Sequence, residues 1–161
     1  MTRMLTSLIT LLAVVGLTFV GLGWWSGRSP PAALGLVNGR LTPCDPAPHC
    51  VCSDAGDSGD AQHWVDAIAL PALADDIRLR VLREVLAASG GKLVREEQNY
   101  LHATYTSRLL RFVDDVELRV DGAQLQLRSS SRVGYSDLGA NRQRIEDLRA
   151  RLMLAFAGVK P

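Results

Sequence analysis

Three cysteines lie close together in the first third of the chain, at Cys44, Cys50 and Cys52. Two prolines turn the chain between the first two, so a short disulfide loop is possible, and such a bridge forms in an oxidising compartment. Three free thiols are the first alternative. The second is a soft metal ion bound with His49 or His63 nearby. No paired C-x-x-C motif is present, so we expect a Cys44–Cys50 disulfide, no bound metal and one remaining thiol at Cys52.

Two adjacent carboxylates, Asp114 and Asp115, are of the residue type that carries out acid–base chemistry. They lie in an alternating stretch that predicts a strand, so their side chains point to opposite faces and cannot share a proton across one substrate. We therefore predict structural ion pairs. Asp115 is expected to pair with Arg128, and Asp114 with Arg108 or Arg111.

An arginine-containing loop, SSSRVGYSDLGANR, connects the last predicted strand to the last predicted helix. A helix N-terminus offers unpaired backbone N–H groups and partial positive charge, and arginines bind anions through paired hydrogen bonds. The loop is thus a candidate site for a phosphate, a carboxylate or a lipid headgroup. In the structural alternative, Ser136 or Asp137 caps the helix and Arg132 pairs with a carboxylate of the domain. The ligand-binding candidates are Arg128, Arg132, Tyr135, Ser136, Asp137, Asn141 and Arg142.

A membrane-tethered enzyme is a second functional hypothesis, in which Asp115, His102 or Asp137 acts beside Arg132. No nucleophile at a fixed spacing accompanies His102, and the sequence contains no P-loop, H-E-x-x-H, G-x-S-x-G or dinucleotide-binding motif. We therefore name no catalytic residue and no cofactor. A third hypothesis is thiol or metal handling through the cysteine run at Cys44–Cys52.

The element that precedes all of these residues is an apolar N-terminal segment. The 22 residues from Met4 to Trp25 contain no charged residue, and about 20 helical residues cross a hydrocarbon core of ~30 Å. A cleavable signal peptide has a shorter apolar core of about 7–15 residues, whereas here Trp24 and Trp25 follow directly and suit the headgroup interface. We predict an uncleaved transmembrane anchor over residues 4–25, with a cleaved signal as the alternative.

A Pro- and Gly-rich acidic tether is predicted over residues 26–63. Residues 41–76 contain seven Asp and no Lys or Arg, whereas residues 101–161 contain ten basic and seven acidic residues. The tether is expected either to be a solvated loop or to fold back on the basic domain. The net charge of the whole chain is only +1, which argues against a nucleic-acid partner.

An α+β domain is predicted over residues 64–158. Apolar residues at spacings of three and four predict a helix with Asp75 or Asp76 as its N-cap, which Gly90 and Gly91 end. Alternation between Tyr100 and Thr106 predicts a strand. Shorter strands are expected in WVDAIAL (64–70) and over 93–95.

The Asp121-Gly122 pair lies between two alternating runs and predicts a two-residue hairpin turn. With that turn, Leu118 faces Leu125, and one face of the hairpin is apolar while the other is polar. The polar face is expected to be exposed to solvent or covered by a partner. A last helix is predicted from Ser136 or Asp137, with an apolar stripe of Leu138, Ile145, Leu148, Leu152, Ala155 and Phe156. These elements predict two layers: an antiparallel sheet of four or five strands with two helices on one face.

The stretch YLHATYTSRLLRFVDDVELRVD, followed by RSSSRVGYSDLGANRQRIEDLR, resembles the bacterial and plastid family called domain of unknown function 1499 (DUF1499). The run PCDPAPHCVCS resembles the proline-rich, cysteine-containing start of that domain. The resemblance covers about Leu41 to Leu152, and Cys52 stands where the family usually has Ser. It implies an exported or membrane-anchored domain and carries over no catalytic residue.

Together these features predict a single-pass protein of the bacterial inner membrane, with the folded domain on the periplasmic side. Basic residues flank both ends of the anchor, so the positive-inside rule does not orient it, and the expected disulfide decides the side. The leading hypothesis is a binding or accessory module. Its expected partners are the lipid bilayer through the anchor and an anionic lipid, an envelope component or an envelope protein.

Overall fold

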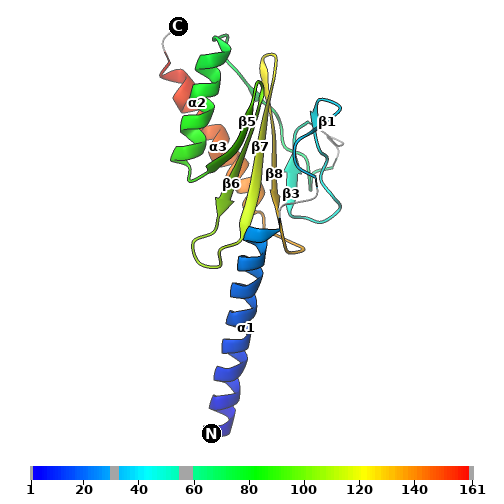
Figure 1. Cartoon of the computed structure of the whole chain (residues 1–161), viewed down its shortest axis with the longest axis vertical. Coiled ribbons are helices and arrows are strands. Elements are labelled where there is room, and N and C mark those ends of the chain that lie inside the picture. Colours follow the sequence, from blue (N-terminus) through cyan, green and yellow to red (C-terminus); the bar gives the residue numbers. More distant parts are fainter. Residues whose placement is uncertain (1, 30–32, 55–59, 160–161) are drawn as a thin grey trace.

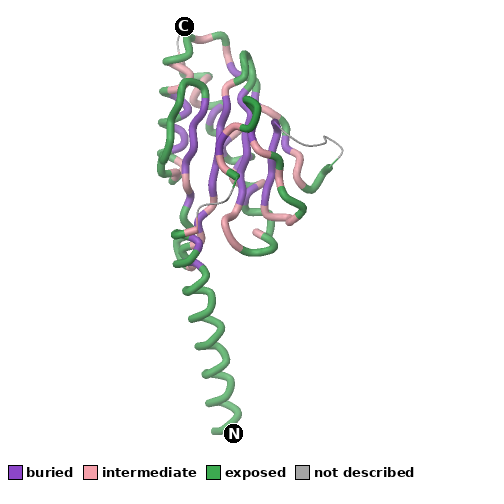
Figure 2. The backbone as a smooth tube through the Cα atoms, turned by 45° about the vertical axis from the view of Figure 1, so that its right-hand side comes forward, coloured by how far each residue is buried: buried purple, intermediate pink, exposed green. Residues whose placement is uncertain are grey.

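A long N-terminal helix leads into a two-layer domain (Figure 1). The computed structural model describes residues 2–29, 33–54 and 60–159. Helix α1 (Thr2–Arg28) extends away from the domain and is almost entirely exposed (Figure 2). It is long and apolar enough to cross a membrane, a property that a signal sequence shares. The α+β class and the N-terminal apolar helix are as predicted.

The domain is built on a six-stranded antiparallel sheet, one or two strands more than predicted. Four long neighbouring strands form most of it, in the spatial order β8–β7–β6–β5, and short strands β3 and β4 both pair with β8. The short strands have too few residues to show a sequence period. The strands are β3 (Cys50–Cys52), β4 (Ile68–Ala69), β5 (Lys92–Glu97), β6 (Tyr100–Thr106), β7 (Val113–Asp121) and β8 (Gln124–Ser131).

The hairpin between β7 and β8 is present, but its predicted register is wrong by two residues. Leu118 pairs with Leu127, and Asp121 pairs with Gln124, so the turn residues are Gly122 and Ala123. Gly122 has a φ of 59°, in the left-handed region that glycine adopts at little cost. A slip of two residues keeps every side chain on its face, so the apolar face of the hairpin is as predicted.

Two helices cover the apolar face of the sheet: α2 (Asp75–Ala88) and α3 (Ala140–Ala157) (Figure 1). Neither Asp75 nor Asp76 caps α2, because both lie in its first turn and Ala74 is the N-cap residue. Leu138 does not join the stripe of α3, since it precedes the helix and is exposed. The helices and sheet enclose a core centred on Val81, Leu82, Leu86, Leu101, Val116, Leu118, Leu125, Leu127, Ile145, Leu148 and Leu152.

The predicted tether is instead largely part of the domain. The hairpin of β1 (Leu36–Val37) and β2 (Arg40–Leu41) lies against the polar face of the sheet, opposite the helices, and strand β3 extends the sheet beside β8 (Figure 1). Leu41 and Cys52 pack with Tyr100 in a second, small apolar cluster there. The part of the polar face over β7 and β8 is therefore covered by the chain itself, whereas β5 is exposed. Pro30 and Pro31 of the predicted tether and residues 55–59 lie outside the described residues.

Candidate functional site

The covered polar face contains Asp115, which lies on β7 and has no exposed surface. Arg132 donates to both of its carboxylate oxygens at 2.8 Å, and the Nε2 atom of His102 lies 2.7 Å from Oδ1. Burial raises the pKa of Asp115, but the hydrogen bonds from Arg132 and His102 outweigh it, so the pKa lies below the usual value. The carboxylate is therefore held ionised between two partners.

The next carboxylate along β7 on the same face, Glu117, is also fully buried. It accepts hydrogen bonds from the backbone N–H of Gly35, the hydroxyl of Tyr100 and the guanidinium of Arg128, each at 2.7 Å. Burial and the bond to Glu117 raise the pKa of the Tyr100 hydroxyl. Residues 33–54 form what we call the covering segment, and Glu117 joins this segment, through Gly35, to strands β6 and β8.

A third pair connects the covering segment to β7. Arg119 donates to both oxygens of Asp54, at 2.7 and 2.8 Å, and also to Asp121. Asp54 also accepts the backbone N–H of Leu41. Burial raises the pKa of Asp54, but these donors lower it to a value below the usual one. At this point the acidic segment does fold back on the basic domain, as one of the two alternatives predicted. We call the three groups around Asp115, Glu117 and Asp54 the buried ionic network.

The predicted ion-pair partners are only partly those observed. Arg128 pairs with Glu117 and not with Asp115, because the two-residue slip in register places Glu117 directly opposite it. Asp114 does face the helices, as expected, but its partner is Arg144 of α3 at 2.6 Å. Arg108 and Arg111, the predicted partners of Asp114, make no ion pair within the described ranges.

The loop predicted to bind an anion is occupied mostly by the chain's own groups. Asp137 accepts the backbone N–H groups of Gly139 and Asn141 at 2.9 and 2.7 Å; α3 begins at Ala140 and its N-cap residue is Gly139, not Ser136 or Asp137 as predicted. Arg142 donates to the backbone carbonyls of Ala61, Gln62 and Trp64. These contacts fix the segment before β4 onto α3. They favour the structural alternative for this part of the loop.

The remaining candidates of the loop separate into buried and exposed residues. Asn141 is buried and bonds to Ser129, Ser131 and the carbonyl of His49. Tyr135 and Ser136 are exposed, and Arg132 points toward Asp115. The structure therefore does not bring the seven candidates together in one site.

For the enzyme hypothesis, the structure brings His102, Asp115 and Arg132 together but leaves Asp137 apart, bonded to N–H groups at the start of α3. His102 is 5% exposed, and both oxygens of Asp115 are occupied by donors. A general base needs an accessible lone pair that can reach its substrate. The arrangement favours a structural role for this cluster.

The cysteine run contains the predicted disulfide between Cys44 and Cys50. This bond consumes two of the three thiols, and Cys52 is buried in the apolar cluster beside Tyr100. Within the described ranges, no group of three His, Cys, Asp or Glu side chains could hold a metal ion. The metal hypothesis thus gains no support from the geometry.

A groove of about 710 Å³ lies between the end of α1 and the outer side of strands β5, β6 and β7. Four of its lining residues are basic, and no carboxylate is among the described residues that line it. Arg132 already holds Asp115, whereas Arg28, Lys92 and Arg111 make no ion pair with described residues. The groove is lined by Val20, Gly23, Trp24, Gly27, Arg28, Lys92, Leu93, Val94, Thr104, Thr106, Arg111, Val113 and Arg132. We call it the basic groove.

Contacts between α1 and the domain form one wall of the basic groove. The Ser26 hydroxyl is buried; it accepts the N–H of Val113 at 3.0 Å and donates to the carbonyl of the same residue at 3.3 Å. A Cβ atom at Gly23 would meet the Leu110 carbonyl oxygen at 1.6 Å, so only glycine permits this approach. Arg28 stacks over the Trp24 ring at 3.5 Å.

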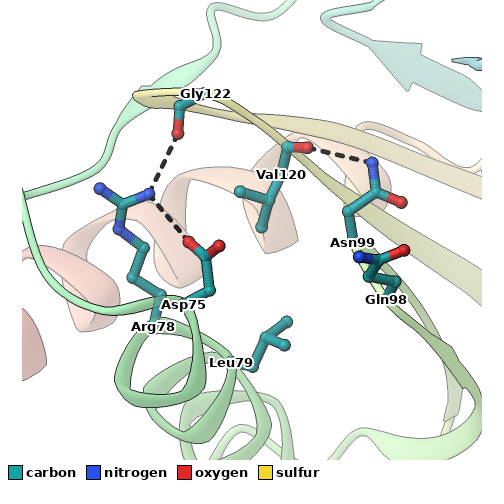
Figure 3. A pocket seen from close by; sticks show the side chains of 7 residues that line it. All are labelled: Asp75, Arg78, Leu79, Gln98, Asn99, Val120 and Gly122. Atoms are coloured by element: carbon teal, nitrogen blue, oxygen red, sulfur yellow. Dashed lines mark hydrogen bonds and ion pairs between the residues drawn. The ribbon is translucent and has the colours of Figure 1, made fainter.

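A second hollow, at the opposite end of the domain, is shown in Figure 3. It lies between α2 and the two hairpin turns, with a volume of about 420 Å³. Arg78, the one cation among the described residues that line it, donates to Asp75 and to the carbonyls of Gly122 and Pro71. The guanidinium therefore joins α2 to the β7–β8 turn and is not directed toward a ligand.

The sequence did not predict the basic groove. Lys92 and Arg28 lie 64 positions apart in the printed sequence, and only folding brings them to the same hollow. A partial signal was present, because Arg28 directly follows the apolar segment and the paired Trp residues. Such a position is typical of the headgroup level.

The family model described as "Protein of unknown function (DUF1499)" matches residues 40–152. The match begins at Arg40, within the segment predicted as a tether, and ends at Leu152 in α3. It covers the sheet, α2, most of α3 and the disulfide loop, but not α1. No curated protein matches the chain.

Proposed function

Because the chain belongs to the DUF1499 family, whose description names no activity, we propose its function from the geometry: it is a membrane-anchored module that binds an anionic amphiphile in the basic groove. The observation that carries this proposal is the charge of the lining. Arg28, Lys92 and Arg111 face a hollow that no described carboxylate lines.

The location of the groove supports this ligand class. In the proposed arrangement α1 spans the bacterial inner membrane, so the groove opens at the level where the helix leaves the hydrocarbon. Trp24 and Arg28 are residue types found at that interface. The domain lies on the periplasmic side, since a Cys44–Cys50 bridge suits an oxidising compartment.

The lining suits a molecule with a charged head and an apolar part. Val20, Leu93 and Val94 supply apolar surface, while the cations and two threonines supply hydrogen-bond donors. Phosphate oxygens accept charge-assisted bonds from Arg and Lys. The chemistry recognised is therefore a phosphate-bearing headgroup, whether it belongs to a lipid of the same bilayer or is free in solution.

Retention of α1 is part of the proposal, because the helix forms one wall of the groove. The buried hydrogen bonds between Ser26 and Val113 and the close approach at Gly23 support a helix that stays with the mature domain. We expect the N-terminus of the protein isolated from membranes to precede Ser26 when measured by intact mass. A mass that begins after Trp25 would contradict the anchor.

Binding is tested with the full chain in detergent, titrated with short-chain phosphatidylglycerol, short-chain phosphatidylcholine or inorganic phosphate. We expect phosphatidylglycerol to bind most tightly, and Lys92→Glu to weaken it by at least about tenfold, a loss equal to ~1.4 kcal/mol. Arg80→Glu is the matched control, because Arg80 is exposed on α2, away from the groove.

Two outcomes would contradict the proposal. One is equal affinity for the anionic and the zwitterionic lipid. The other is an equal loss of binding in Lys92→Glu and Arg80→Glu. Binding of inorganic phosphate with the affinity of the lipid would assign the site to a free anion and remove the amphiphile from the proposal.

A further inference from the structure

Two loops lie at the end of the domain from which α1 emerges. The β6–β7 loop (107–112) and the β8–α3 loop (132–139) extend on either side of the last turns of α1 (Figure 1). The first touches the helix directly, because the Leu110 carbonyl lies against Gly23. The second contributes Arg132 to the same groove as Gly27 and Arg28. Both loops thus lie near the level of Trp24 and Trp25.

These loops present large apolar side chains to the surroundings. Leu109 is 86% exposed, Tyr135 is 79% exposed and Leu138 is 96% exposed. Three such residues on two loops at one end of a domain are more than isolated exposed side chains, which are common on any protein surface. In water this exposure is unfavourable, so a second medium or a partner is expected to cover them.

The charges of the same loops indicate which medium this is. Arg108 and Arg111 flank Leu109 and Leu110, and neither makes an ion pair within the described ranges. The one carboxylate of the second loop, Asp137, is directed to backbone N–H groups of α3. Apolar side chains beside basic ones are typical of segments that lie in the headgroup region of an anionic bilayer.

The backbone holds the loops in an uncommon shape. Arg111 and Leu138 have φ values of 60° and 56°, in the left-handed region that residues with side chains rarely occupy. At Leu138 this conformation precedes the cap of α3 and leaves the side chain almost wholly exposed. Asp137 and the start of α3 therefore fix a leucine outward at this end of the domain.

We propose that loops 107–112 and 132–139 seat the domain on the bilayer that α1 crosses, with Leu109, Tyr135 and Leu138 in the headgroup region. The occupant of this surface is the lipid of that bilayer, because α1 brings both loops to it. The inference rests on the proposed membrane insertion of α1, but it does not depend on a ligand in the basic groove. It fixes the height and orientation of the domain over the membrane.

The test uses the full chain in vesicles of phosphatidylglycerol and phosphatidylcholine, with an environment-sensitive fluorophore on single introduced cysteines. Leu109→Cys and Leu138→Cys report the two loops, and Val15→Cys reports the centre of α1. Gln98→Cys is the matched control, because Gln98 is an exposed loop residue at the far end of the domain. Cys52 is buried and the other two cysteines form a disulfide, so the label attaches to the new thiol.

We expect lipid-attached nitroxides near the headgroup to quench labels 109 and 138 strongly and label 98 hardly at all. Arg108→Glu should reduce quenching at 109 in anionic vesicles, and this residue does not line the basic groove. Quenching of label 15 together with water-like emission at 109 and 138 would overturn the seating proposal and leave the anchor intact. Absence of quenching at 15 by a nitroxide placed deep on the lipid acyl chain would overturn both proposals.

Discussion

The buried ionic network and the basic groove lie side by side on the outer side of one sheet, but they differ in whether their cations are paired with carboxylates. In the network, Arg119, Arg128 and Arg132 each hold a carboxylate within 2.8 Å. In the groove, Arg28 and Lys92 face a described lining without carboxylates. A buried charge must be paired inside the protein, because an unpaired one is costly. A charge at an open hollow is solvated and can bind an external ligand. Pairing therefore separates structural cations from candidate ligand-binding ones.

Glu117→Ala should give the largest effect on stability. It leaves the Tyr100 hydroxyl, the Gly35 N–H and the Arg128 guanidinium without their acceptor in a buried place. We expect a loss of about 3–5 kcal/mol in the free energy of unfolding, measured by urea denaturation. Glu84→Ala, on the exposed face of α2, is the control. Equal effects of the two substitutions would contradict the structural role of the network.

Removing the disulfide by Cys44→Ser with Cys50→Ser should have a smaller effect. The bridge closes a loop with a sequence separation of six, for which chain entropy gives about 2 kcal/mol. The covering segment would then be held less firmly over the buried ionic network. Hydrogen exchange should become faster at the backbone N–H of Leu41, which bonds to Asp54, and at that of Gly35, which bonds to Glu117. Unchanged exchange at these amides would show that the cover holds without the bridge.

The contribution of Asp115 should depend on pH. Its folded pKa is lowered, so the stability it provides is fully present above the unfolded value of 3.8 and is lost as pH falls through the folded value. The difference in unfolding free energy between the natural chain and Asp115→Asn should be constant from neutral pH to about pH 5 and shrink below pH 3.8. A difference that grows on acidification would contradict the assignment.

Arg111→Ala should have the smallest effect, within about 0.5 kcal/mol of the natural chain, because Arg111 is exposed and without an ion pair among the described residues. Arg119→Ala, which removes a partner of buried Asp54, is the direct comparison and should cost several times more. Thermal or urea unfolding of both variants measures the contrast. Similar losses would remove the distinction between the two regions.

The sequence allowed the elements with a clear period to be predicted. The alternation at Tyr100–Thr106 matches β6, and the apolar spacing after Asp75 matches α2. The register of β7 and β8 was missed, because Gly122 accepts either the first or the second position of a two-residue turn. That slip of two residues changed the expected partner of Arg128 from Asp115 to Glu117.

The covering segment and the basic groove could not be predicted in the same way. Residues 36–52 contain strands of two or three residues, too short to show alternation, and their prolines suggested a tether. Their place depends on contacts distant in sequence, such as Asp54 with Arg119. In the sequence, nothing distinguishes Lys92 from the other charged residues. Only the folded position of β5 brings it into the same groove as Arg28.

The hydrogen bonds between Ser26 and Val113 also have a mechanical consequence. They join the end of α1 to β7 at a buried point, so the helix and the sheet are coupled there without a flexible hinge at Ser26. A membrane helix changes its tilt when the thickness of the bilayer changes. With α1 in the membrane as proposed, the domain would lean with its helix, and the direction in which the basic groove opens would vary with membrane thickness.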